Sequence, residues 1–464
     1  MPSWDRQSPQ AQAKIQDAAL RAQLRDSVGP FSPYWRERFA ALRKPASSIT
    51  SVRELAALPA VGERDVCPDG DPRGAARLVL QADEGGYALH SPGPDLRKAL
   101  VRRVRGAAAY RRQVEAATRP TTYHLGGRAF SFPIASTRAD LDVVARAGNR
   151  AWQVLGLSRS DVLVSAVPAG ATLDHLFLVN AALGAGAPAL HPRVGDDLAP
   201  VAAALRELPA TVLALPAATA AETAAALAGA GAPFDGITTV LVVGATTDDQ
   251  LPAALADAGL GSANVRRLYG PPEGRVLWAE CQPGSGFHTY PDLDVVEIVD
   301  PETAEPTTGG GELVVTQLGF RGTALLRWRT GDLVSGPVAT TSCPGCARTV
   351  PRVPSDVRAG ALVPRVELRS GLTSVDARAL AGALTGRPDL ADWRVETVRS
   401  SRDGARDLVV LVAPEGDETD AAVGAYGDVL AASGVRPAQV VVVDRMTLAS
   451  RPPGSPTPRV DLPK

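Results

Sequence analysis

Between residues 141 and 243, short apolar runs rich in β-branched residues alternate with longer stretches rich in Ala and Leu. The short runs predict strands, and the longer stretches predict helices. The expected strands are 161–167, 187–191, 211–215 and 239–243, and the expected helices are 141–155, 174–184, 198–208 and 218–229. Strands that alternate with helices pair in parallel. The pattern therefore predicts an α/β fold with a doubly wound, mostly parallel sheet.

The remainder of the chain follows other patterns. Residues 11–44 and 97–117 are charged, rich in Ala and Leu, and helix-like, whereas 292–334 indicates antiparallel hairpins with a turn near 307–311. From residue 366 onward we expect a small α+β unit, with strands at 394–398, 408–412 and 440–443 and a helix at 419–431. A chain of 464 residues is too long for one ordinary domain. We therefore expect a large domain at 1–354 and a small one at 355–464, with the boundary near Ser355.

Charge and hydropathy exclude two classes of partner. Lys and Arg total 49 against 50 Asp and Glu, a formal net charge of -1, whereas a nucleic-acid groove needs a basic field. No apolar run approaches the roughly 20 residues that span a bilayer, and no charged-then-apolar leader opens the chain. The sequence therefore predicts a soluble, cytoplasmic protein that binds neither nucleic acid nor membrane.

Four sulfur and imidazole side chains have the spacing of a metal site. Cys281, His288, Cys343 and Cys346 form a C-x6-H pair followed by C-x2-C. Three thiolates and one imidazole suit tetrahedral Zn²⁺, and a set of four protein ligands leaves no position open for catalysis. The alternatives are an unliganded pair of thiols or a disulfide, which the cytoplasm disfavours. We favour structural zinc, and we expect Cys67 to be a packed thiol.

Five further segments follow one another along the chain: FSPYWRERF at 31–39, RRLYGPPEG at 266–274, GFHTYPDLDVVEIVDPETAEP at 286–306, LLRWRTGDLV at 325–334 and CARTVPRV at 346–353. In this order they resemble segments of the adenylate-forming superfamily, and in particular of its phenylacetate-CoA ligase branch. The resemblance implies that family's fold, with a large N-terminal domain for the acyl group and nucleotide and a small C-terminal α+β domain. It also implies an acyl or aromatic small-molecule substrate, and it favours a homodimer.

The resemblance assigns roles to residues at matching positions. Asp332 would accept hydrogen bonds from the ribose hydroxyls of ATP, Tyr269 would stack on adenine, and Glu273 would help to hold Mg²⁺. The alternative is structural: Glu273 could pair with Arg275, and Asp332 could cap a turn. The substrate pocket would be formed by Asp174, His175, Gly244, Ala245, Tyr269 and Gly270.

Three departures from the family pattern weaken the case for ATP chemistry. The phosphate-binding loop corresponds to 121–131, where Gly126 is kept and Arg128 offers one cation, but Phe130 falls where a lysine belongs. The C-terminal catalytic lysine position is occupied by Ser455, and the hinge at 356–362 lacks its acidic pair. A lost preorganised charge removes on the order of 2.7–4 kcal/mol of transition-state stabilisation. We therefore expect that ATP and Mg²⁺ no longer drive the reaction, and that a CoA or carrier-protein thioester brings the acyl group.

New polar residues appear in the same region. Tyr123 and His124 lie where the phosphate loop would begin, and His175 lies at the start of the helix that lines the pocket in relatives. An imidazole there suits a general base or acid, with Tyr123, His124 and Glu273 near it. The structural alternative is that Asp174 caps the helix and His175 is merely half-exposed.

Three hypotheses follow for the function. The first is an ATP-independent enzyme that performs transfer, condensation, cyclisation or hydrolysis on an acyl or carbonyl substrate, in natural-product biosynthesis. The second is an active ATP-dependent acyl- or aryl-CoA ligase in which Arg128 compensates for the missing lysine. The third is a non-catalytic relative that binds a ligand or a partner protein.

Overall fold

The computed structural model describes residues 4–67, 72–81, 118–127, 132–194, 198–245, 250–358, 390–399, 406–414, 426–428 and 439–442, with single positions at 104, 106 and 108. Most of the helix-like stretch 97–117 lies outside these residues, as do Arg128, Phe130, most of the hinge and Ser455. None of the described helices is both long enough and apolar enough to cross a membrane. The domain boundary near Ser355 stays a prediction.

The N-terminal helical region is broken into short helices rather than one long one. Ser32 caps α3 by accepting a hydrogen bond from the backbone N–H of Trp35, and Pro33, which has no N–H to donate, starts the helix. Trp35 and Phe39 pack into a core shared with Leu326 and Trp328. The elements are α1 (Pro9–Gln23), η1 (Leu24–Val28), α2 (Gly29–Phe31), α3 (Pro33–Ala41), η2 (Ala46–Ser48), η3 (Val52–Ala57), α4 (Glu63–Val66) and η4 (Pro72–Leu78).

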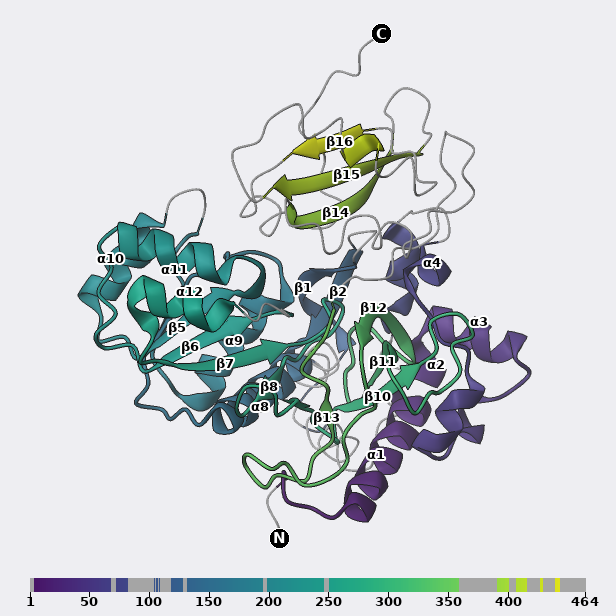
Figure 1. The fold of residues 1–464 in the computed structure, drawn as a ribbon. Helices are drawn as coiled ribbons and strands as arrows, with labels where there is room; N and C mark the ends of the chain where they lie inside the picture. Colours follow the sequence, from purple (N-terminus) through teal and green to yellow (C-terminus); the bar gives the residue numbers. More distant parts are fainter. Residues whose placement is uncertain are drawn as a thin grey trace.

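A sheet of eight strands forms the centre of the fold (Figure 1). Its order is β13-β9-β8-β7-β6-β5-β3-β4, with the five strands from β7 to β4 parallel and the rest antiparallel. The strands are β3 (Leu163–Ser165), β4 (Ala189–Leu190), β5 (Val212–Pro216), β6 (Thr239–Val243), β7 (Asn264–Tyr269), β8 (Trp278–Glu280), β9 (Phe287–His288) and β13 (Arg352–Val353). The predicted doubly wound parallel sheet is confirmed.

Helices cover both faces of the parallel strands. On one face α8 and α9 pack so closely that a side chain on Gly148 would lie 2.3 Å from the Cα of Ala181. On the other face α10, α11 and α12 enclose a separate apolar core. Strand residues alternate between the cores, with Leu163 in the first and Val164 in the second. The helices are α8 (Arg138–Leu155), α9 (Leu173–Ala185), α10 (Ala199–Glu207), η5 (Ala217–Thr219), α11 (Ala220–Gly229), α12 (Leu251–Leu255) and η6 (Ala256–Leu260).

Three smaller sheets complete the described structure. The predicted antiparallel hairpins are confirmed as β10 (Asp294–Val299), β11 (Gly311–Gln317) and β12 (Trp328–Val334). A hairpin of β1 (Pro120–Gly126) and β2 (Phe132–Thr137) precedes α8, whose start is fixed by a capping box between Thr137 and Asp140. The C-terminal strands are also confirmed, as β14 (Leu390–Arg399), β15 (Arg406–Pro414) and β16 (Gln439–Val442); of the expected helix at 419–431, residues 426–428 are described and helical.

Candidate functional site

The carboxyl ends of the parallel strands, called here the carboxyl edge, gather most of the predicted substrate residues. His175 lies in the first turn of the helix after β3, Gly244 and Ala245 follow β6, and Tyr269 and Gly270 lie at the end of β7. The chain reaches β4 on one side of β3 and β5 on the other, so the winding direction reverses between β3 and β5. Ligands of open α/β sheets bind outside the carboxyl ends at such a reversal. The sheet topology therefore brings these residues to the edge where a ligand is expected.

The start of α9 differs from the expectation in one respect. Thr172, not Asp174, is the N-cap, because its hydroxyl accepts a hydrogen bond from the backbone N–H of His175 at 3.4 Å. Thr172 has the extended backbone that an N-cap needs, whereas Asp174 already lies inside the first helical turn. The structural alternative for Asp174 is therefore wrong, although an acidic residue in the first turn still suits the helix dipole.

His175 has a neighbour that the sequence interpretation missed. His191 directly follows β4, and its ring stands perpendicular to that of His175, with 5.4 Å between centroids and 88° between planes. Three of the four ring nitrogens of this pair, Nδ1 of His175 and both nitrogens of His191, are shielded from solvent and have no hydrogen-bond partner among the described residues. The sequence signal existed, because the predicted strand 187–191 ends at His191 and its carboxyl end had to lie at the same edge.

Both imidazoles of the pair are neutral at pH 7. Burial lowers the pKa of His175 from its usual value. Burial also lowers the pKa of His191 to about 4, and the positive charge that His175 can carry adds to this effect. A neutral imidazole offers one N–H donor and one lone pair. The pair can therefore donate hydrogen bonds to a ligand and accept a proton from it.

Tyr123 and His124 lie in strand β1, not in a loop. Residues 121–126 of the predicted phosphate loop 121–131 form strand β1, which pairs with β2 at 132–137, so these residues are strand rather than loop. Residues 128–131 lie outside the described part of the chain. Because side chains alternate along a strand, Tyr123 is 53% exposed while His124 is buried. The Nε2 atom of His124 donates to the carbonyl oxygen of Pro272 at 3.1 Å. Burial, aided by the charge of Arg275, lowers the pKa of His124 to about 4.

The end of this hairpin packs on the segment that carries Glu273. A side chain on Gly126 would lie 2.9 Å from Cγ1 of Ile134 and 3.0 Å from the Cα of Glu273, so a larger residue would push these neighbours apart. The backbone N–H of Gly127 donates to Oε1 of the buried Glu273 at 3.2 Å. The buried Arg275 guanidinium is held by the carbonyl oxygens of Ala135 and Thr323 and by the side chain of Gln317. The fold thus brings Gly126 and Glu273 into contact.

Tyr269 and Asp332 also meet, from strands 63 residues apart in the chain. The Tyr269 hydroxyl donates to Oδ2 of Asp332 at 2.5 Å, and both side chains are buried. The Tyr269 ring packs against Trp278 and Phe287 at centroid distances of 5.9 and 5.3 Å. The turn after Tyr269 is tight, since a side chain on Gly270 would lie 2.6 Å from the carbonyl oxygen of Val276. Gly244, with φ of 116°, adopts a backbone conformation that favours glycine.

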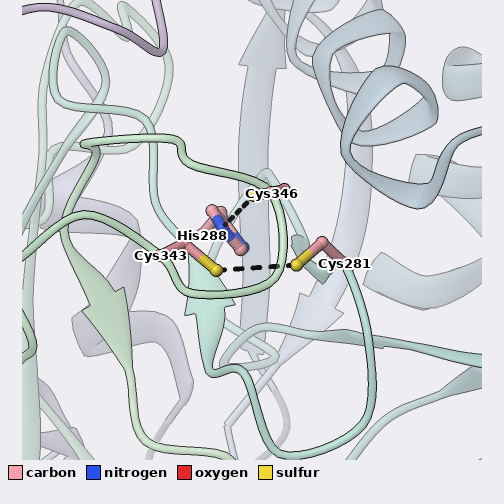
Figure 2. A group of neighbouring side chains, drawn as sticks. All are labelled: Cys281, His288, Cys343 and Cys346. Atoms are coloured by element: carbon pink, nitrogen blue, oxygen red, sulfur yellow. Dashed lines mark hydrogen bonds between the residues drawn. The ribbon is translucent and has the colours of Figure 1, made fainter.

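The four predicted metal ligands lie close together (Figure 2). They belong to the end of the strand order formed by β8, β9 and β13, whereas β3 and β4 form the other end of the same sheet. The ligand atoms of Cys281, His288, Cys343 and Cys346 all lie within 4.8 Å of one another. The sulfurs of Cys281 and Cys343 are 3.7 Å apart, close to the roughly 3.8 Å that two thiolates bound at about 2.3 Å to a tetrahedral zinc would show. The same distance is too long for a disulfide, and neither Cys281 nor Cys343 is part of one.

The surroundings of this cysteine–histidine cluster favour metal binding. Nδ1 of His288 donates to the carbonyl oxygen of Ala279 at 3.2 Å, which leaves Nε2 to face Cys346 Sγ at 3.3 Å. Such a bond to the remote nitrogen fixes the tautomer that ligates metals. Burial opposes the thiolate of Cys343, but hydrogen bonds from the backbone N–H groups of Gly345 and Cys346 outweigh it and lower the pKa of Cys343. The four residues fit a metal ion such as zinc, and a site with four protein ligands would leave no position open for catalysis.

Comparisons with known proteins bear on the fold. No protein-family model matches the sequence, and no curated protein matches it. Among solved structures, 2-hydroxyisobutyryl-CoA ligase in complex with 2-HIB-AMP and CoA is similar in its open conformation, with a TM-score of 0.61, 17% identity, and coverage of 100% of this chain and 92% of that one. Its thioesterification state gives a TM-score of 0.62 at 16% identity, covering 100% of this chain and 91% of that one.

A third structure of 2-hydroxyisobutyryl-CoA ligase, in the postadenylation state with R3-HIB-AMP, has a TM-score of 0.61 at 16% identity. It covers 96% of this chain and 88% of that one. The similarity extends over the whole chain, the predicted large and small parts alike, although few residues are identical. This chain therefore has the fold of the adenylate-forming CoA ligases.

Proposed function

We propose that this protein uses the CoA-ligase fold without ATP-dependent adenylation and acts on an acyl thioester or another reactive carbonyl compound, with His175 as general base. One observation carries the proposal: at the carboxyl edge, where a ligand is expected, a neutral imidazole pair has nitrogens that no described residue satisfies. A neutral imidazole in a substrate pocket is the form that accepts a proton.

Two features count against ATP chemistry. The chain has four lysines, Lys14, Lys44, Lys98 and Lys464, and none lies in the segments that resemble the family. The carboxylate of Asp332, which would bind ribose, is buried and already accepts a hydrogen bond from Tyr269. A ribose would have to share this carboxylate with Tyr269. Both features favour a substrate that arrives already activated.

The proposed chemistry needs one proton acceptor and one leaving group. His175 takes the proton of an attacking nucleophile, which bonds to the carbonyl carbon of the thioester. The tetrahedral intermediate then expels the thiolate of CoA or of a carrier protein, and His175 returns the proton to it. General base catalysis of this kind contributes about 10²–10⁴-fold. The nucleophile, whether water, an alcohol, an amine or a carbon acid, decides between hydrolysis, transfer, cyclisation and condensation.

An ATP-dependent CoA ligase is the second candidate function. It is favoured by the contact of Gly126 with Glu273, two residues to which the resemblance assigns places in the phosphate loop and at Mg²⁺. It requires binding of ATP with Mg²⁺ and release of AMP and pyrophosphate from ATP, a carboxylate and CoA.

One set of assays separates the candidates. Metal-replete protein is titrated with MgATP by calorimetry and is incubated with a panel of aliphatic and aromatic acyl-CoA thioesters, with and without MgATP, while free thiol, AMP and pyrophosphate are measured. We expect thiol release without nucleotide. Release of AMP would establish the ligase instead, and saturable ligand binding without turnover would establish a non-catalytic binding protein.

Variants on α9 test the base. His175→Ala should lower nucleotide-independent turnover by about 10²–10⁴-fold. Leu183→Ala is the matched control, since Leu183 is 72% exposed near the other end of the same helix. Equal rates in wild type and His175→Ala would remove His175 from the mechanism.

A further inference from the structure

His191 has two buried ring nitrogens that form no hydrogen bond with any described residue. The residue follows the edge strand β4, its side chain is half-buried, and both ring nitrogens are shielded from solvent without a hydrogen-bond partner. In neutral imidazole one nitrogen is a donor and the other an acceptor. Each buried group left unmet costs about 1–3 kcal/mol. A ligand at this position would remove the cost.

Packing between the two rings does not explain the nitrogens. An edge-to-face contact at 5.4 Å is ordinary for planar rings, so it accounts for the geometry of His175 and His191. In such a contact the edge of one ring points at the face of the other, so at most one of the three unpartnered nitrogens gains a weak N–H···π interaction. At least two nitrogens still have no hydrogen-bond partner among the described residues.

A metal ion is the less suitable occupant. Zinc sites use three or four protein ligands. Among the residues that the structure describes, the one group of three or more His, Cys, Asp or Glu side chains with metal spacing is the cysteine–histidine cluster, at the other end of the sheet. The His175–His191 pair offers only two imidazoles. Hydrogen bonding to an organic ligand therefore fits the pair better than metal coordination.

We propose that His191 is a second catalytic residue, which donates a hydrogen bond to the acyl carbonyl oxygen of a thioester substrate while the adjacent His175 handles the proton. This inference rests on the proposed function and extends it to a named oxygen-binding group. When the nucleophile attacks the carbonyl carbon, the C=O electron pair moves to the oxygen, and the N–H of His191 stabilises the oxyanion. The C–S bond then breaks as the oxygen reforms its double bond, and the thiolate takes the proton held by His175.

The charge distribution of the pair suits these roles. Only one of the two imidazoles needs to become positive during the reaction, and the positive charge of His175 disfavours protonation of His191. His191 thus remains a neutral donor while His175 becomes an imidazolium beside the oxyanion, where opposite charges attract. Oxyanion donors in water-excluded sites contribute about 10²–10³-fold to kcat.

Kinetics of full-length, metal-replete variants form the first part of the test. We expect His191→Phe to lower kcat for an acyl-CoA thioester by about 10²–10³-fold with little change in KM, and His191→Gln, which keeps an N–H donor, to recover part of the loss. Thermal unfolding shows whether each variant is folded. Wild-type kcat in both variants would overturn the role of His191, even if His175→Ala confirms the base.

A binding experiment that does not depend on turnover forms the second part. Benzoate, whose carboxylate oxygens mimic the acyl oxygen, is titrated into protein with ¹⁵N-labelled histidine, and the imidazole resonances are assigned with the His175→Ala and His191→Phe variants. We expect saturable shifts of the His191 signals in the wild type; these signals are absent from His191→Phe. Shifts without any turnover would refute the proposed function but keep the oxygen site, whereas unmoved His191 signals would refute the oxygen site.

Discussion

Histidines lie at both ends of the strand order of the eight-stranded sheet, and the surroundings of their ring nitrogens differ. At the β8–β9–β13 end, His288 donates through Nδ1 to a backbone carbonyl and presents Nε2 to three cysteines. At the β3–β4 end, His175 and His191 present three ring nitrogens with no described partner. In the first arrangement a single bound ion would contact all four side chains. In the second, the ring nitrogens suit a group with oxygen or N–H atoms. Satisfied polar groups brace a fold, and unsatisfied ones mark a place for a ligand.

Removing the metal should have the largest effect. Binding of structural zinc contributes on the order of 10–16 kcal/mol in small zinc domains, because the ion holds segments that the chain alone does not. We expect elemental analysis to find about one zinc per chain, and Cys343→Ser or a strong chelator to lower the melting temperature markedly. Cys67→Ser is the matched control, since Cys67 is a buried cysteine outside the cluster. Metal-free protein that melts like the wild type would contradict the structural zinc site.

Removing the hydrogen bond between Tyr269 and Asp332 should have the next largest effect on stability. Tyr269→Phe removes the hydroxyl and leaves the buried Asp332 carboxylate without that donor. The loss of such a bond costs about 1–3 kcal/mol. Urea unfolding should show a destabilisation in this range, with the aromatic packing kept because the ring remains. Unchanged stability would mean that the hydrogen bond between Tyr269 and Asp332 does not stabilise the fold, in contrast to the metal site.

The acid limb of the pH–rate profile should report His175. A lowered pKa keeps this base neutral to a lower pH, so activity should be full above that pKa and fall about tenfold per pH unit below it. We expect the midpoint below the usual imidazole value of about 6.5. The measurement is kcat/KM for a thioester from pH 4.5 to 8. An acid limb centred above that value would argue that another group is the base.

Replacing His191 should have the smallest effect on stability, and with the opposite sign. His191→Phe keeps a planar ring against His175 and removes two unmet polar atoms. We expect the free energy of unfolding to rise by about 1 kcal/mol, while kcat falls. A gain in stability with a loss of activity is typical of ligand sites. Destabilisation by His191→Phe would show that the nitrogens of His191 serve the fold.

The sequence predicted the local elements well where pattern and chemistry agreed. Strand 239–243 was confirmed at both ends, and the cluster of Cys281, His288, Cys343 and Cys346 was anticipated because thiols and imidazole at those spacings have few other uses. The helix start at Leu173 was misjudged, since both Thr172 and Asp174 are good caps and only the backbone conformation chooses between them. Of the loop expected at 121–131, residues 121–126 are strand because β1 pairs with β2, a contact that local sequence does not encode.

By itself, the sequence determined the alternation of strands and helices, the antiparallel segment and the four members of the cysteine–histidine cluster, because periodicity and side-chain chemistry act over short stretches. Only the tertiary structure decided that His191 stands against His175, since this required β4 to pair beside β3 at the edge of the sheet. Tertiary packing likewise buried His124 and turned Tyr123 outward. The order of strands in a sheet depends on long-range pairing, and no local pattern in the chain specifies which strand will be the neighbour.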